Sequence, residues 1–78
     1  MVDEKQFLQN FADQFDDEPE NLTLDTKFRD IEGWASIVAL SVMAMCDEEY
    51  EVILSANEME SANQVSDIYD IVNKRYKG

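Results

Sequence analysis

Ser36 stands where an irregular segment of the chain becomes a predicted helix, in the sequence Gly33-Trp34-Ala35-Ser36-Ile37. Its simplest role is to cap that helix, because serine is a favoured residue at helix N-termini. The alternative role is chemical. A phosphate ester on the Ser36 hydroxyl would lie against free backbone N–H groups and the positive end of the helix dipole. The residue types alone leave both roles open.

Few other residues offer reaction chemistry. The chain has no histidine, which excludes Ser-His and Cys-His nucleophile pairs and zinc sites with histidine ligands. The lone cysteine, Cys46, cannot form an internal disulfide or a thiolate cluster. Cys46 also falls on the inward stripe of a predicted helix, which favours a buried apolar role. We therefore expect no catalytic residue and a fold held by packing, which suits a reducing cytoplasm.

Carboxylates are the abundant charged groups. Eighteen Asp and Glu against six Lys and Arg give a net charge of −12, and residues 30–73 contain no Lys or Arg. This charge disfavours nucleic acid and membrane headgroups as partners, and it favours proteins with basic docking patches. A hydrolase built on a carboxylate pair such as Glu48 and Glu51 is a weak alternative, because such pairs need a cleft and a raised pKa.

A calcium site is the other chemistry that these carboxylates suggest. Asp47, Glu49, Glu51 and Glu58 match ligand positions of an EF-hand loop. Val52 stands where that loop needs a glycine for its sharp turn, and the residues that follow are apolar. We expect no metal site here, only diffuse and weak binding of divalent cations.

Apolar spacing predicts an all-α fold in a single domain, residues 1–78. Three longer helices and one short one are expected, forming a four-helix bundle. The predicted ranges are 3–15, 36–50, a short turn at 56–61, and a last helix that carries Val65 to Tyr76 with Asn63 as its N-cap. Residues 16–35 form a long connection whose apolar side chains should pin it to the core. The longest apolar run is too short to span a bilayer, and acids near the start are unlike a signal peptide.

Helix 36–50 carries apolar residues on two faces. The expected inward stripe consists of Ala39, Met43, Cys46 and Tyr50, helped by Val42. A second stripe consists of Ile37, Leu40, Ala44 and Asp47. A surface helix needs only one apolar stripe, so the second stripe is either buried as well or available to a partner.

These features form a wider pattern around Ser36. After the junction at 33–37 come Leu40, Val42, Met43, Cys46, Asp47-Glu48-Glu49-Tyr50, Val52 and Leu54. In this pattern, in its length and in its acidity, nearly the whole chain resembles the acyl carrier proteins. The resemblance implies a four-helix bundle in which Ser36 carries phosphopantetheine on a phosphodiester. The terminal thiol of that arm would hold an acyl cargo as a thioester.

The resemblance also implies roles for the two stripes. Ile37, Leu40 and Ala44 would be exposed docking contacts, with Asp47 and Glu48 as their charged rim. The partners would be a phosphopantetheinyl transferase and acyl-loading, elongating or transferring enzymes with basic patches, meeting a monomeric carrier. The lining of an acyl pocket would be Phe28, Ala39, Met43, Cys46, Ala62 and Ile68, although a plain packed core explains the same residues equally well.

Three positions depart from the family pattern. The family usually has Asp before its serine, whereas this chain has Ala35. With alanine there, the Ser36 hydroxyl could be drawn into capping, the helix start could shift, and modification by a transferase should slow. Glu51 and Ser55 replace a Gly and a Pro of many bacterial fatty-acid carriers, which hints at a specialised pathway. The alternative to a carrier is an acidic helical interaction domain without a prosthetic group.

Overall fold

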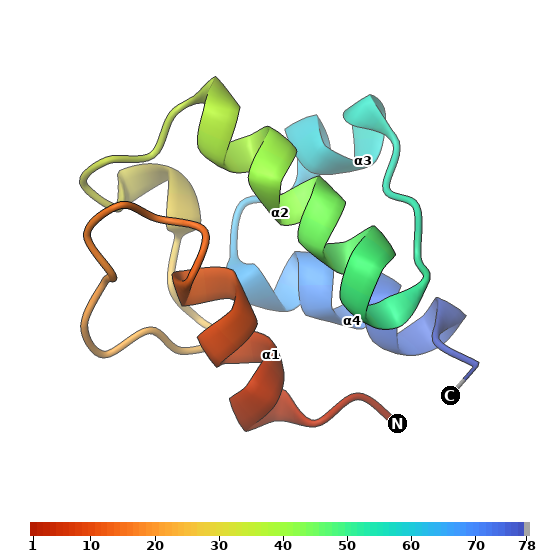
Figure 1. The fold of residues 1–78 in the computed structure, drawn as a ribbon. Helices are drawn as coiled ribbons and strands as arrows, with labels where there is room; N and C mark the ends of the chain where they lie inside the picture. Colours follow the sequence, from red (N-terminus) through yellow and green to blue (C-terminus); the bar gives the residue numbers. More distant parts are fainter. Residues whose placement is uncertain (78) are drawn as a thin grey trace.

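Four helices make up most of residues 1–77, the part of the chain that the computed structural model describes. They are α1 (Glu4–Ala12), α2 (Ser36–Tyr50), α3 (Ala56–Ser61) and α4 (Val65–Arg75), with a 3₁₀ turn, η1 (Phe28–Asp30), before α2 (Figure 1). Residues 1–77 contain no strand, only an isolated antiparallel bridge between Lys27 and Gln64. The described chain is therefore all-α, as predicted, and none of its helices could cross a membrane.

The ends of α1 and α4 differ from the predicted bounds. α1 ends at Ala12, because the N–H groups of Gln14 and Phe15 turn back to the carbonyls of Phe11 and Ala12 at 3.2 and 3.1 Å. The side chain of Phe15 is nevertheless buried and contributes to the core. The helical spacing of apolar residues therefore continues past the end of the helix. The N-cap of α4 is Gln64 and not Asn63.

The prediction of an Asn63 cap was wrong because Asp67 performs the capping from inside the helix. Its carboxylate accepts the N–H groups of Asn63 and Gln64 at 2.9 and 3.0 Å. These two bonds lower the pKa of Asp67, with the Gln64 N–H as the larger cause. The sequence signal for this start was an acid three residues into the helix, as in a capping box.

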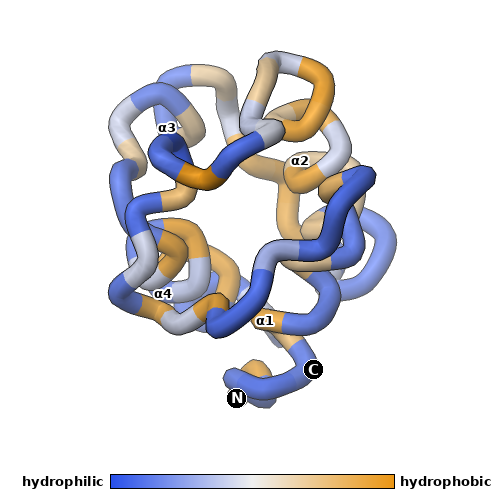
Figure 2. The backbone as a smooth tube through the Cα atoms, turned by 90° about the vertical axis from the view of Figure 1, so that its left-hand side faces the viewer, coloured by the Kyte–Doolittle hydropathy of each residue, from blue (hydrophilic) through white to orange (hydrophobic). Residues whose placement is uncertain are grey.

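The core is centred on aromatic rings from α1. Phe7 is fully buried, and its ring centroid lies 5.8 Å from that of Tyr50 on α2 and 5.3 Å from that of Tyr69 on α4. The ring of Phe11 lies 5.9 Å from that of Phe28 in η1. Figure 2 shows that the most continuously hydrophobic part of the chain is α2, which packs against α1. One cluster therefore joins α1, α2, α4 and η1.

The connection between α1 and α2 is bonded to α4. The N–H of Val65 donates to the carbonyl of Thr26 at 3.0 Å, and the N–H of Ser66 donates to that of Leu24 at 2.8 Å. The first N–H groups of a helix have no partner inside the helix. Here the connection supplies those partners for α4.

Arg29 of η1 bonds in the same way to α3. Its guanidinium donates to the carbonyls of Met59, Glu60 and Ala62 at 2.9, 2.8 and 3.2 Å. Carbonyls at a helix C-terminus have no partner inside the helix, and a cation is favoured there. We call this set of bonds the Arg29 clamp, and it fixes the C-terminal end of α3 against η1.

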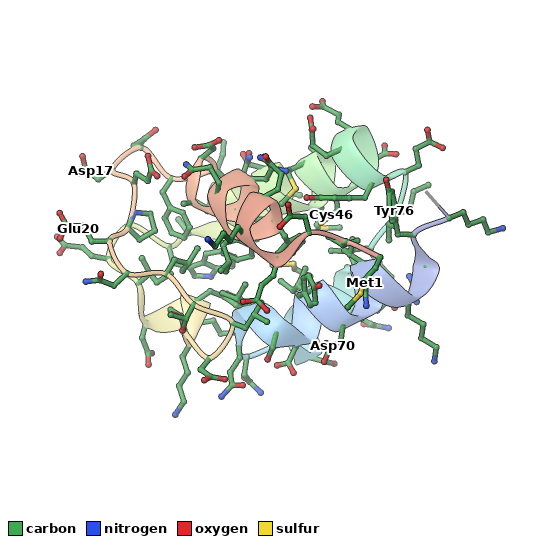
Figure 3. All side chains as sticks on the ribbon, turned by 90° about the horizontal axis from the view of Figure 1, so that it is seen from below. Met1, Asp17, Glu20, Cys46, Asp70 and Tyr76 are labelled. Carbon is green, nitrogen blue, oxygen red and sulfur yellow. The ribbon has the colours of Figure 1, made fainter. Side chains whose placement is uncertain are left out.

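Residues ahead of α1 are bonded to α4. The N–H of Val2 donates to Oδ1 of Asn73 at 2.9 Å, and the hydroxyl of Tyr69 donates to the carbonyl of Val2 at 2.6 Å. Figure 3 shows this segment crossing beside α4, with Met1 labelled. The Val2 side chain is buried, so the start of α1 is fixed by both packing and hydrogen bonds.

Glu58 on α3 pairs with Arg75 on α4 and also accepts the N–H of Ser55 in a capping box. The Arg75 bond is the main cause that lowers the pKa of Glu58 from 4.5 to about 2. A group whose pKa is lower in the folded state than in the unfolded state stabilises the fold at pH values above its unfolded pKa. That stabilisation is lost as the pH falls through the folded-state pKa. We expect urea midpoints of the native chain and Glu58→Gln to differ by a constant amount above about pH 5 and to converge toward about pH 2.

The matched control for this pH dependence is Glu60→Gln, which removes a neighbouring exposed carboxylate of α3. Its urea midpoint should follow that of the native chain at every pH. A gap between the native chain and Glu58→Gln that stays constant down to pH 2 would contradict the assignment of the low pKa to Glu58.

Candidate functional site

α2 begins at Ser36, as predicted. Ala35 has extended backbone angles (φ −155°, ψ 171°), and its carbonyl accepts the N–H groups of Val38 and Ala39 at 3.0 and 3.1 Å. Ala35 is therefore the N-cap, and Ser36 is the first residue of the helix. Ahead of them Gly33 has φ +94°, a left-handed conformation that favours glycine and turns the connection into α2.

No side chain caps the N-terminus of α2. The N-termini of α1 and α3 are capped by Asp3 and Ser55, and Asp67 caps that of α4. Those three helices also carry an acid in their first turn, whereas α2 carries none. Open N–H groups and the positive end of the helix dipole favour an anion at this place. Ser36 is exposed beside them and does not act as the cap.

A cleft of about 530 Å³ lies against Ser36, between α2 and α3. We call it the Ser36 cleft. Its lining is mostly apolar and consists of Arg29, Trp34, Ala35, Ser36, Ala39, Leu40, Met43, Ala56, Met59 and Glu60. Trp34 is held by the ring of Phe28, whose centroid is 4.7 Å away, and the Arg29 clamp holds the α3 wall. Trp34 and the α3 wall of the cleft are therefore both held by contacts with η1, not with α2.

The acyl-pocket candidates fall into two groups. Ala39 and Met43 are half-buried and line the Ser36 cleft. Phe28, Cys46 and Ile68 are packed inside the core, and Ala62 is buried where α3 ends. The structure therefore brings only Ala39 and Met43 of this set to the cleft beside Ser36.

The docking candidates lie together on the exposed side of α2. Ile37 and Leu40 are 72% and 63% exposed, and Ala44, Asp47 and Glu48 are exposed after them. This second stripe is therefore not buried. Two large aliphatic side chains in water next to Ser36, followed by two carboxylates, give a surface with both apolar and acidic character.

The inward stripe of α2 differs from the prediction. The residues it buries are Val38, Val42, Met45, Cys46 and Tyr50. The predicted stripe instead contained Ala39 and Met43 and left out Val38 and Met45. α2 packs against α1, while the Ala39 and Met43 edge faces the Ser36 cleft. A short α3 of six residues leaves that edge half open.

Cys46 is fully buried, as predicted, and lies in the interior in Figure 3. Burial raises the pKa of its thiol from 9.0 to about 12, because a thiolate loses its hydration there. A reactive thiol requires a lowered pKa and access to solvent. Cys46 has neither property and acts as a small apolar core residue.

Arg29 and Met59 line the Ser36 cleft but were not predicted from the sequence as site residues. Met59 had a signal, since it follows Ser55 and Glu58 in the short helix. Arg29 had none, because its three carbonyl partners are 30 to 33 residues away along the chain.

Carboxylates do not converge as metal ligands would. Within residues 1–77 no group of three or more Asp, Glu or Cys side chains is placed to hold an ion. Asp47 and Glu49 lie in the last turn of α2, where an EF-hand would need a loop. Glu51 follows in a left-handed conformation (φ 55°), and Glu58 is paired with Arg75.

Comparisons of the chain with known protein families, with curated proteins and with solved structures gave no match in any of the three.

Proposed function

We propose that this chain is an acyl carrier protein, in which Ser36 bears phosphopantetheine and α2 presents the cargo to partner enzymes. The observation that carries the proposal is the exposed Ser36 at the uncapped N-terminus of α2, at the edge of an apolar cleft. The described residues form four helices and no strand, which is compatible with the four-helix bundle that the family resemblance implies. The chain itself would perform no catalysis.

The residues around Ser36 fit a phosphodiester. The first turn of α2 holds no acid that would repel it, and no side chain occupies the open N–H groups. The helix dipole and these groups stabilise an adjacent negative charge by about 0.3–1 kcal/mol. Ser36 is an exposed residue, so a modifying enzyme can approach it. The arm, when attached, would supply a terminal thiol that holds an acyl group as a thioester.

The remaining residues have orienting and recognition roles in this proposal. Trp34 and the Arg29 clamp hold both sides of the Ser36 cleft, whose apolar lining offers contact to a hydrophobic cargo. The exposed Ile37, Leu40 and Ala44 supply apolar contacts for partners. Asp47 and Glu48 attract basic patches, which raises the association rate more than the affinity. Phosphopantetheinyl transferases and acyl-handling enzymes are the partners proposed.

Intact mass spectrometry tests the proposal. After incubation with coenzyme A and a broad-specificity phosphopantetheinyl transferase, the chain should gain the mass of one phosphopantetheine. Ser36→Ala should gain nothing. Ser41→Ala, which changes another serine of α2 five positions away, should gain the same mass as the native chain. A chain that gains no mass, even with an acid restored at position 35, would instead be an acidic helical interaction domain without a prosthetic group.

Ala35 gives a second, quantitative prediction. Ala35→Asp supplies the missing cap for α2, which should stabilise the chain by about 1 kcal/mol and raise its melting temperature by about 4–8 °C. The same variant should be modified several-fold faster, because a docking carboxylate is restored. Thermal unfolding followed by circular dichroism and initial modification rates give the two measurements.

Ala35→Asn is the matched control, because asparagine caps a helix as well as aspartate does but carries no charge. It should raise the melting temperature nearly as much while leaving the modification rate close to that of the native chain. Equal modification rates for the native chain and Ala35→Asp would contradict the role given to the missing acid.

A further inference from the structure

A second cleft lies on the other side of the α2 start. It has a volume of about 660 Å³ and is formed by residues 14–19, residues 31–33 and the beginning of α2. We call it the acidic cleft. Ala35 lines both this cleft and the Ser36 cleft, so the two flank the Ser36 position. Of the docking candidates on the exposed side of α2, only Ile37 also lines the acidic cleft.

The acidic cleft combines an apolar floor with an acidic rim. Phe15 and Val38 are buried at its floor, Ile31 is half-buried, and Ile37 is 72% exposed. The rim carries Asp16, Asp17, Glu18 and Glu32, and no Lys or Arg lines the cleft. Figure 3 shows the labelled Asp17 pointing outward from the segment after α1.

These rim carboxylates have no cationic partner within residues 1–77, where the one ion pair is that of Glu58 and Arg75. They do not converge on a metal position either. An apolar floor with unpaired acids around it is complementary to an aliphatic side chain flanked by cations. A helix provides that arrangement when Lys or Arg stands three or four residues from a Leu or Ile.

We propose that the acidic cleft is a second docking site, which takes a basic amphipathic segment of a partner protein. One aliphatic side chain of that segment packs against Ile37 and Val38, and its Lys or Arg neighbours pair with the carboxylates of Asp16 and Asp17. The site does not require a modified Ser36. Its binding can therefore be measured on the unmodified chain and on Ser36→Ala, independently of the proposed carrier function.

The test is a titration of the ¹⁵N-labelled full chain at about 0.15 M salt, where long-range attraction is screened. The probe is a synthetic amphipathic helical peptide of leucine, lysine and arginine. Amide shifts should concentrate in residues 14–19 and 31–38. A peptide with the same charge but serine in place of leucine should bind about tenfold more weakly, because the apolar floor gains no contact.

Matched variants separate this cleft from the charge of the whole chain. The pair Asp16→Asn and Asp17→Asn should weaken binding about fivefold, while Asp25→Asn with Asp70→Asn, which removes the same charge elsewhere, should change it by less than about twofold. Ile37→Ala should weaken binding about fivefold, and Leu40→Ala, similarly exposed but in the Ser36 cleft, should not. Equal weakening by the two charge pairs, shifts centred on Leu40 and Asp47, or no binding of the leucine peptide would each overturn the proposal.

Discussion

Phe7→Ala is expected to leave a large fraction of the molecules unfolded at room temperature. Phe7 is fully buried and its ring contacts those of Phe11, Tyr50 and Tyr69, so it joins α1 to α2 and α4. Removing a buried phenylalanine side chain costs about 3–5 kcal/mol, since the apolar contacts are lost and a cavity remains. Small domains unfold with about 5–15 kcal/mol in total, and a chain of this size lies near the lower end.

Urea denaturation followed by far-ultraviolet circular dichroism measures the Phe7 effect. The control is Ile53→Ala, which also removes a large apolar side chain but at a position that is 76% exposed. Its free energy of unfolding should stay within about 0.5 kcal/mol of the native value. A Phe7→Ala chain as stable as Ile53→Ala would mean that the aromatic cluster does not hold the helices together.

Arg29→Ala is expected to lower the free energy of unfolding by about 2 kcal/mol, because the Arg29 clamp is lost. Three carbonyls at the end of α3 then keep only water as a partner, and the positive charge near that helix end disappears. The effect should be strongest in α3. Amide hydrogen exchange there should speed up more than in α1 or α2, which the clamp does not contact.

Lys27→Ala is the control for Arg29, because it removes a nearby exposed cation that takes part only through its backbone in the bridge to Gln64. It should leave stability within about 0.5 kcal/mol of the native value. Arg29→Lys should fall between the two, since an ammonium keeps the charge but cannot reach three carbonyls with a planar fork. Equal effects of Arg29→Ala and Lys27→Ala would show that charge alone, and not the clamp, stabilises α3.

Helix positions were predictable wherever apolar spacing and breaking residues agreed. Residues 36–50 contain no Gly or Pro, and α2 spans that range in the structure. The short helix at 56–61 was also predicted with the right bounds. The end of α1 was not, because Phe15 continues the helical spacing while its backbone has already left the helix. The spacing of apolar residues shows which side chains are buried. It does not show the backbone conformation, because a helix and an irregular segment can bury the same side chain.

The position of Ser36 was predictable, but its surroundings were not. Local sequence placed Ser36 at a helix start. The two apolar faces left open whether Ile37 and Leu40 are buried, and only the family resemblance implied the exposure that these side chains have in the structure. Which of those faces is fully buried depends on which helices lie next to α2, and this decided between Met43 and Met45. The Arg29 clamp likewise depends on residues far apart in the chain.

The segment 24–29 has a consequence for the order of folding. Leu24 and Thr26 bond the start of α4, and Arg29 bonds the end of α3 across separations of 30 to 33 residues. α3 and α4 are neighbours in the chain and can meet after a short search, but their ends are satisfied only when this segment docks. Closing such long loops costs entropy before any bond repays it. We therefore expect the docking of one irregular segment, more than helix formation, to set the folding rate of this all-α chain.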